Sequence, residues 1–299
     1  MMENIMIIVP HEDDEILMTA GIIEKAVINN KKVTVVMATN GDYEGTDKIS
    51  GSIRLQETIN GLAVLGVPEE NVIFMGYADT GMYPTESFLY KLYQEKDENR
   101  LFPGHCSSET YGLPQKPEYH SMKHGKPAEY TRKNFKNDLQ EIILEKMPDT
   151  IFTTSEEDMH GDHSGLFLFV KEILEEQINY HPELYSGVVH SKAGDENWPV
   201  RNPEVFRYIQ SKYKVAQSYE ETKRENVEYF ICPENFNDGD LKWEDRISFL
   251  VPENMMSADF YRNKKVKALD QHVNALKLDA VHFLYSFIAM EELFWKIDY

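Results

Sequence analysis

The sequence predicts an α/β protein in which helices flank a mostly parallel sheet. Three observations support this fold class. In the first half of the chain, short β-branched or apolar runs alternate with segments of helical periodicity, as in strand–helix–strand units. The chain has 299 residues, of which 41% are hydrophobic, so it can build one large domain or two small ones. Its longest purely apolar runs are far shorter than the roughly 18 residues of a membrane span.

Three strand–helix steps are expected before residue 76. The buried strands are predicted at residues 4–9, 32–38 and 71–75. A first helix should span about residues 15–28, and Asn29-Asn30 should end it. The second helix is indicated by apolar residues at helical spacing, namely Leu55, Ile59, Leu62 and Ala63.

The regular pattern stops between about residues 82 and 130, where Tyr, His, Pro, Gly and Lys are frequent. A segment of this length favours an active-site lid. A surface insertion with its own helix at 87–95 is an equally good interpretation. As a lid, the segment would stack aromatic rings on a pyranose or close off a smaller pocket, through Tyr111, Tyr119, His120 and His124.

Regular structure is expected again from Phe135, with a helix that Pro148 closes and a strand at 150–154. The next helix should begin near Ser164, with Asp162 as its N-cap.

The segment from about residue 180 is expected to be a C-terminal extension of a single domain over residues 1–299. Strand-like pieces and loops around Trp198 and Trp243 should precede two helices, one at about 258–276 and another reaching Phe294.

Charge and cysteine content exclude several functions. Asp plus Glu number 51 against 31 Lys plus Arg, a net charge of −20, which repels nucleic acid and anionic membranes. A small-molecule partner is therefore expected, and self-association into a homo-oligomer stays open. Cys106 and Cys232 cannot form a disulfide framework or a CxxC metal site, so both are expected to be reduced thiols. No secretory signal is visible, which predicts a cytoplasmic protein.

Two clusters of ionisable side chains directly follow predicted strands. Residues 11–15 contain one histidine and four carboxylates, and residues 158–163 contain two histidines and two aspartates. Loops at the carboxyl edge of a parallel sheet bring residues from separate strands together, and ligands bind in the crevice there. We therefore expect the two clusters to converge.

The residue types in these clusters are typical of a catalytic metal site. His11 and Asp14 are three residues apart, so one tight turn can direct both at an ion, and His163 would complete three protein ligands. Zn²⁺ held in this way keeps an open position for a water with a pKa of about 7. Fe²⁺, Co²⁺ or Mn²⁺ also accept such ligands. Asp13 would act as the general base, and His160 would stabilise an oxyanion or donate a proton.

A plainer interpretation exists for each cluster. The carboxylates of residues 12–15 would complement the dipole of the following helix, while His160 and His163 would be a helix cap and a solvated side chain. The position of both clusters after predicted strands favours the metal site.

The clusters resemble the motifs of the PIG-L or LmbE-like N-acetylglucosaminyl deacetylase family. Residues 11–15 read HEDDE and are similar to its (P/A)HPDDE motif, and residues 160–163 read HGDH and are similar to its HxDH motif. Three more segments resemble its Thr-x-Gly loop, RxxE helix and Gly-x-x-Asp loop in order and spacing: residues 38–42, 54–57 and 76–79. The resemblance covers about residues 4 to 175.

The resemblance implies a Rossmann-like fold and zinc-dependent removal of an N-acetyl group from a GlcNAc-type amino sugar or its conjugate, giving acetate and a free amine. By motif position, His11, Asp14 and His163 would hold the zinc ion. Asp13 would be the base, and His160 would be the oxyanion or acid partner. In the expected mechanism, a protonated His160 stabilises the oxyanion.

The resemblance also places Arg54 and Asp79 at positions that face the sugar in relatives. Alternatively, Arg54 would pair with Glu57 on the helix surface, and Asp79 would be an ordinary turn residue. Glu12 stands where the family motif has proline, which permits a looser turn because proline fixes φ.

Two other functions remain open on the sequence. One is a metal-dependent amidohydrolase that acts on a non-sugar acyl amide. The other is a noncatalytic module that binds a sugar or nucleotide, although no Gly-x-Gly-x-x-Gly motif follows the first strand.

Overall fold

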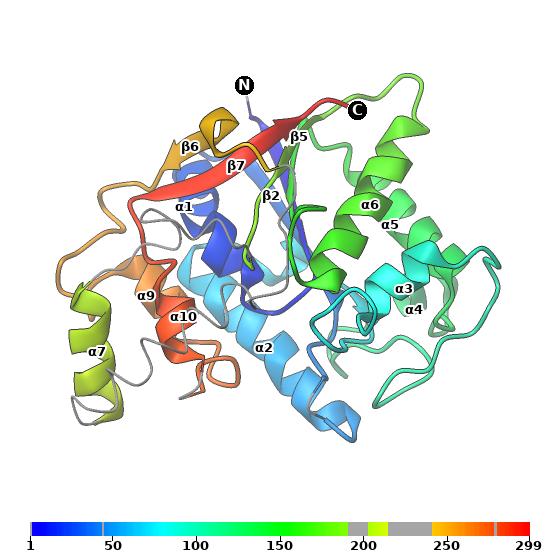
Figure 1. Ribbon diagram of the computed structural model, residues 1–299, viewed down its shortest axis with the longest axis horizontal. Helices are drawn as coiled ribbons and strands as arrows, with labels where there is room; N and C mark the ends of the chain where they lie inside the picture. Colours follow the sequence, from blue (N-terminus) through cyan, green and yellow to red (C-terminus); the bar gives the residue numbers. More distant parts are fainter. Residues whose placement is uncertain (1, 44, 191–202, 215–240, 278–279) are drawn as a thin grey trace.

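A seven-stranded sheet in the order β3-β2-β1-β4-β5-β7-β6 forms the centre of the protein in a computed structural model (Figure 1). The structure describes residues 2–43, 45–190, 203–214, 241–277 and 280–299. The strands are β1 (Asn4–Val9), β2 (Lys32–Thr39), β3 (Val72–Tyr77), β4 (Thr150–Thr153), β5 (Glu183–Ser186), β6 (Ile247–Leu250) and β7 (Glu291–Ile297). The first five strands pair in parallel, and β7 is antiparallel to both of its neighbours. The predicted α/β class with a mostly parallel sheet is confirmed.

Helices cover both faces of the sheet (Figure 1). On one side lie α1 (Asp14–Ile28), α2 (Lys48–Val64), α7 (Pro203–Tyr213), α9 (Lys264–Leu269) and α10 (Val281–Tyr285). On the other lie α3 (Phe88–Gln94), α4 (Tyr119–His124), α5 (Arg132–Lys146) and α6 (Gly161–Glu175). Two short 3₁₀ helices, at Glu69–Asn71 and Trp243–Asp245, complete the described helical elements.

The central strand β1 is buried on both faces of the sheet, which explains its continuously apolar sequence. Ile5, Ile7 and Val9 belong to the core that contains α1 and α2, while Met6 and Ile8 belong to the core that contains α5 and α6. A parallel strand that is buried on both faces needs apolar side chains at successive positions.

The order of the strands places a ligand-binding crevice at the sheet edge where the two clusters of ionisable side chains were expected to converge. From β1 the chain continues to β2 and β3 on one side, whereas β4 and β5 lie on the other side of β1. The strand order therefore reverses between β1 and β4, the point at which ligands bind in open α/β sheets. The loop of residues 10–13 leaves β1 there, and the loop of residues 154–160 leaves β4.

The N-terminal predictions are confirmed within a few residues, and the insertion contains the expected helix, α3. The C-terminal predictions are partly wrong. The helix expected to reach Phe294 is the shorter α10, Val281–Tyr285, and the end of that segment is strand β7, because it pairs with β5 and β6 at the sheet edge. The helix expected at 258–276 is the shorter α9, which begins after its N-cap Asn263. Trp198 and Cys232 lie outside the described residues, and Cys106 is a free thiol.

Within the described ranges, no helix combines the length and the apolar character that crossing a bilayer requires.

Candidate metal centre

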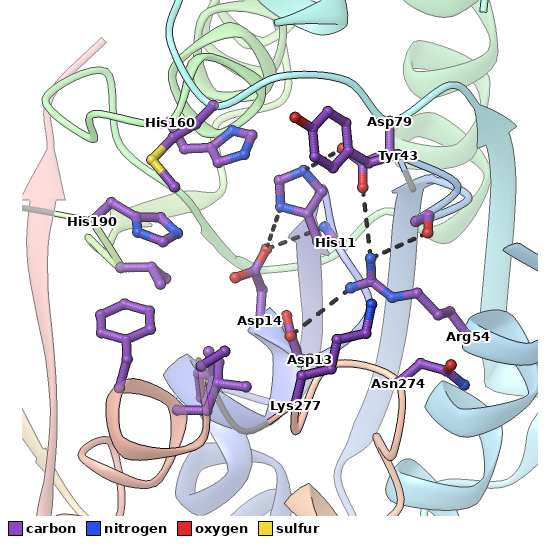
Figure 2. A pocket seen from close by; sticks show the side chains of 18 of the residues that line it. His11, Asp13, Asp14, Tyr43, Arg54, Asp79, His160, His190, Asn274 and Lys277 are labelled. Atoms are coloured by element: carbon purple, nitrogen blue, oxygen red, sulfur yellow. Dashed lines mark hydrogen bonds and ion pairs between the residues drawn. The ribbon is translucent and has the colours of Figure 1, made fainter. Parts of the chain in front are cut away.

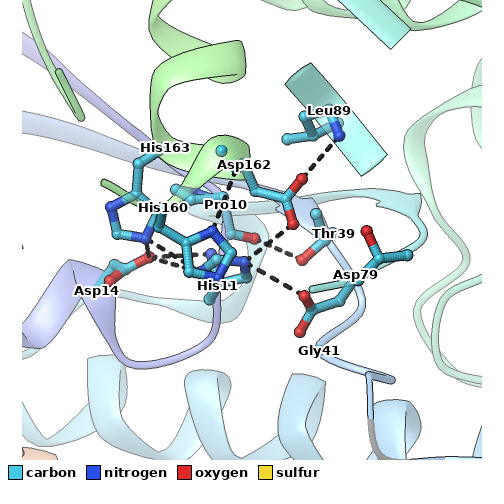
Figure 3. A network of polar contacts seen from close by, with 12 residues as sticks. Pro10, His11, Asp14, Thr39, Gly41, Asp79, Leu89, His160, Asp162 and His163 are labelled. Atoms are coloured by element: carbon cyan, nitrogen blue, oxygen red, sulfur yellow. Dashed lines mark hydrogen bonds and ion pairs between the residues drawn. The ribbon is translucent and has the colours of Figure 1, made fainter. Parts of the chain in front are cut away.

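Three ligand atoms meet at the β1–β4 edge, from His11 in the loop after β1, Asp14 at the start of α1 and His163 in α6 (Figure 3). His11 Nδ1 lies 3.1 Å from His163 Nε2 and 3.4 Å from Asp14 Oδ2, and His163 Nε2 lies 3.3 Å from the same Asp14 oxygen. Ligands bound at about 2.0–2.1 Å around a tetrahedral Zn²⁺ ion are roughly 3.3–3.4 Å apart. The described side chains already have the spacing of three tetrahedral ligands.

Local hydrogen bonds hold the turn that carries two of these atoms. The backbone N–H of His11 donates to Asp14 Oδ2 at 3.1 Å, and Pro10 O accepts from both the N–H and the hydroxyl of Thr39. Asp14 is the first residue of α1, where the helix dipole favours a carboxylate. The turn after β1 is therefore tied to itself and to the end of β2.

Each imidazole directs its other nitrogen at a carboxylate. His163 Nδ1 lies 3.1 Å from Asp158 Oδ2, and His11 Nε2 lies 3.4 Å from both Asp79 Oδ1 and Asp162 Oδ2. Protons held by these outer pairs leave lone pairs on the two inner nitrogens, which face each other and the Asp14 oxygen. Three lone pairs converging in a buried space fit a cation, and carboxylate partners on metal-binding histidines are a common feature of zinc sites.

The electrostatics of the cluster also favour positive charge. Burial lowers the pKa of His163, but Asp14 and Asp158 outweigh it and raise that pKa to about 10. Burial likewise opposes the charged form of His11, yet Asp79, Asp14 and Asp162 hold its pKa well above the usual value. The same carboxylates would attract a divalent ion in place of protons.

Asp13 lies beside the three ligand atoms and lines the pocket (Figure 2). Its φ of 143° is a backbone conformation that residues other than glycine rarely adopt, and such strain is concentrated at functional sites. Burial, and then the charge of Asp14, raise the pKa of Asp13 to about 7. A carboxyl group with this pKa can both accept and release a proton near neutral pH.

His160 is the N-cap of α6, so the prediction that Asp162 caps this helix is wrong. The backbone N–H of Asp162 donates to His160 Nδ1 at 3.2 Å, which leaves the ring proton on Nε2. Asp162 instead accepts from the N–H of Leu89 at 2.7 Å. Burial and the nearby histidines hold the pKa of His160 well below its usual value. His160 is therefore a neutral N–H donor, and the expected protonated form is not supported.

Arg54 points into the site and does not pair with Glu57 along α2, as one alternative predicted (Figure 2). Its guanidinium donates to Glu12 O at 3.0 Å and to Gly41 O at 3.2 Å, and lies 3.6 Å from Asp79 Oδ2. Glu57 instead accepts from Asn274.

Glu12, at the motif position usually held by proline, is fully buried under this arginine. Its Oε2 lies 3.7 Å from Arg54 Nε, and neither carboxyl oxygen has a hydrogen-bond partner among the residues that the structure describes. Gly41, at φ +60°, leaves the space for this contact, because a Cβ there would lie 2.1 Å from Glu12 Oε2. Asp79 connects the arginine to the histidine cluster through its contacts with His11 and Arg54.

A cavity of about 370 Å³ opens over the ligand atoms. Its first side contains the ionisable residues His11, Asp13, Asp14, Arg54, Asp79 and His160. Its second side comes from Val189 and His190 and from the C-terminal residues Asn274, Ala275, Lys277, Ala280, Phe283 and Leu284. Of the predicted lid of residues 82–129, Met82 lines the cavity, whereas Tyr111 donates to Asp42 and Tyr119 is buried in the core.

Sequence reasoning missed several of these residues. Asp158 and Asp162 stand within five positions of His163, and a carboxylate so close to a predicted ligand histidine is a usable signal. The residues of the second side carry no comparable signal, because common side chains near the C-terminus enter the pocket only through the fold.

Comparison with known proteins gives one family match. The family model of PIG-L, described as GlcNAc-PI de-N-acetylase, matches residues 6–174. No curated protein sequence matches the chain.

Several solved structures resemble the chain at low sequence identity, and the two with a TM-score of 0.50 share its fold. The A40926 pseudoaglycone deacetylase is 14% identical over 99% of this chain and 97% of its own, with a TM-score of 0.50. A deacetylase of the teicoplanin biosynthesis pathway is 14% identical over 98% and 97%, also at 0.50. The N,N'-diacetylchitobiose deacetylase of Pyrococcus horikoshii is 15% identical over 77% and 78%, with a TM-score of 0.42.

Proposed function

The chain belongs to the PIG-L family of GlcNAc-PI de-N-acetylases, and on that premise we propose that it is a metal-dependent hydrolase that removes an N-acetyl group from an amino sugar or its conjugate. His11, Asp14 and His163 would hold the ion, with Zn²⁺ the best fit to two imidazoles and one carboxylate. The observation that carries the proposal is the triangle of their ligand atoms, with sides of 3.1, 3.3 and 3.4 Å.

When bound, a Zn²⁺ ion would act as a Lewis acid toward the acetamide carbonyl and would lower the pKa of a water molecule. Asp13 accepts the proton of the attacking water, whose oxygen bonds to the carbonyl carbon. The same carboxyl group then returns this proton to the nitrogen as the C–N bond breaks, which gives acetate and a free amine. The raised pKa of Asp13 suits both transfers.

His160 and Arg54 act on the substrate without exchanging protons. The Nε2–H of His160 donates a hydrogen bond to the carbonyl oxygen as negative charge develops there, an interaction typically worth about 10²–10³ in rate. Arg54, held by Glu12 and Gly41, offers its guanidinium to the sugar or to the group attached to it. Asp79 is the second proposed sugar contact, and it also orients His11.

A non-sugar acyl amide is the second candidate substrate. The apolar residues Val189, Phe283 and Leu284 on the second side of the cavity favour it, because a pocket for a bare pyranose would need more polar partners. The same wall would accept the apolar part of a sugar conjugate.

A metal-depletion and acetate-release assay tests the proposal. The parent chain, stripped with a chelator and reloaded with Zn²⁺, should release acetate from N-acetylated amino sugars or their conjugates, and the stripped chain should not. His163→Ala should lose both the metal and the activity, whereas His181→Ala, which removes an exposed imidazole elsewhere, should keep both. Equal activity of the stripped and reloaded chains would contradict the proposal that the reaction depends on a metal ion. Acetate release from simple acyl amides alone would favour the second substrate.

A further inference from the structure

Two histidines and an aspartate outside the cavity form a second cluster of potential ligands. We propose that His120, His124 and Asp138 bind a divalent transition metal ion that joins α4 to α5. One ligand atom from each of the three residues lies within 4.8 Å of the others. None of these residues lines the pocket, so the site is distinct from the metal centre at the β1–β4 edge.

Helical spacing brings the two imidazoles together. His120 and His124 are four residues apart on α4 and therefore lie on the same face, with ring centroids 4.4 Å apart. Two histidines at this spacing on a helix are a common metal-binding arrangement. The position of α4 is fixed at both ends, since the Glu118 side chain accepts from the N–H of Ser121 and Gly125 ends the helix at φ 79°.

The neighbouring helix α5 supplies the carboxylate. Asp138 is buried, and its Oδ1 lies 2.7 Å from His120 Nδ1. The hydroxyl of Tyr77 donates to Asp138 Oδ2 at 3.0 Å, which orients the carboxylate and directs Oδ1 toward the histidines. Such an outer hydrogen bond is typical of carboxylates that bind metals.

A fourth donor stands beside the more exposed histidine. Glu141 Oε2 lies 3.3 Å from His124 Nε2, one helical turn after Asp138 on α5. Imidazole and carboxylate ligands suit Zn²⁺, Co²⁺, Ni²⁺ and Cu²⁺, and the exposed fraction of 37% for the His124 side chain gives an ion access from solvent.

The competing interpretation is a network of hydrogen bonds and ion pairs without metal, in which His120 pairs with Asp138 and His124 with Glu141. Both interpretations attach residues 119–124 to α5. Only in the metal site do both imidazoles bind one ion, each through a nitrogen that carries no proton. Direct measurement of metal binding therefore separates the two interpretations.

Equilibrium dialysis of the chelator-stripped full chain against a series of Zn²⁺ concentrations tests this site. The His163→Ala background removes the proposed catalytic centre, and in that background one Zn²⁺ ion per chain should remain bound. His163→Ala/His124→Gln should bind this ion at least about tenfold more weakly. His181→Gln in the same background, a matched loss of an exposed imidazole from the loop between α6 and β5, should bind it unchanged.

Thermal unfolding provides an independent readout. Zn²⁺ that binds the folded chain raises its melting temperature, so the rise should be present in His163→Ala and lost with His124→Gln. The second site would be overturned if His163→Ala/His124→Gln bound Zn²⁺ as tightly as His163→Ala, or if His163→Ala alone bound no Zn²⁺. Two ions bound in that background, one of them lost with His124→Gln, would overturn the proposed catalytic ligands and leave the second site standing.

Discussion

The cavity has two sides of different origin and chemistry. The first side, from α2 and from the segments that follow β1, β3 and β4, contains side chains held by several polar contacts each, such as His11, Asp14 and Arg54. The second side, from residues 189–190 and 274–284, combines apolar side chains with the polar residues His190, Asn274 and Lys277. Under the proposed function, the first side would perform the reaction, where small displacements are costly, and the second side would meet the part of the substrate beyond the scissile bond.

The largest effect should come from the proposed base on the first side. Asp13→Asn keeps the size of the side chain but removes its ability to take a proton, so kcat should fall by about 10²–10⁴. The variant should retain its metal, because Asp13 is not one of the three ligands. Steady-state acetate release and elemental analysis of the same preparation measure both properties.

Asp298→Asn, an exposed change at the end of the chain, is the control for this substitution. If Asp13→Asn turns over at the parent rate, the proton acceptor is another group. If it loses the metal, Asp13 belongs to the ligand set, and the division of roles within residues 11–14 is wrong.

The second-largest effect should be a loss of stability when the buried pair of Glu12 and Arg54 is broken. Arg54→Gln leaves the buried Glu12 and Asp79 carboxylates without their cation, which should lower the free energy of unfolding by about 3–5 kcal/mol. Burial holds the pKa of Glu12 well above its usual value and Arg54 opposes this shift, so adding Glu12→Gln should recover part of the loss by replacing a buried carboxyl group with a neutral amide. Urea unfolding of both single variants and the double variant gives the coupling energy.

Additive losses in that double variant would contradict the pairing of Glu12 with Arg54. Coupling would instead explain why this chain tolerates glutamate at the position of the motif proline. The loop then gains its rigidity from the Arg54 contacts with Glu12 and Gly41 instead of from a proline ring.

The first side could be largely predicted from the sequence. His11, Asp14 and His163 converge because each follows the carboxyl end of a parallel strand, a rule that short sequence patterns reveal. Two further contacts were not predictable: Asp79 reaches His11 from the loop after β3, and which nitrogen of His160 keeps its proton depends on the N–H of Asp162.

The second side was not predicted, for a different physical reason. Residues 291–297 contain an apolar run that is compatible with either a helix or a strand, and pairing with β5 and β6 decides for the strand. The path of residues 274–284 past the cavity depends on that tertiary pairing and on the contact of Asn274 with Glu57. Local sequence contains neither piece of information.

The smallest effect should come from the second side and should change substrate preference alone. Lys277 lines the cavity and is exposed, so Lys277→Gln removes one positive charge without disturbing the core. For a substrate that carries an anionic group near the acetamide, KM should rise about two- to fivefold, as expected for an ion pair in contact with solvent, while kcat stays constant. For a neutral substrate of the same size, both constants should be unchanged. Lys267→Gln on α9, outside the cavity, is the matched control. A fall in kcat for both substrates would place Lys277 with the reacting groups of the first side and would remove the distinction between the two sides.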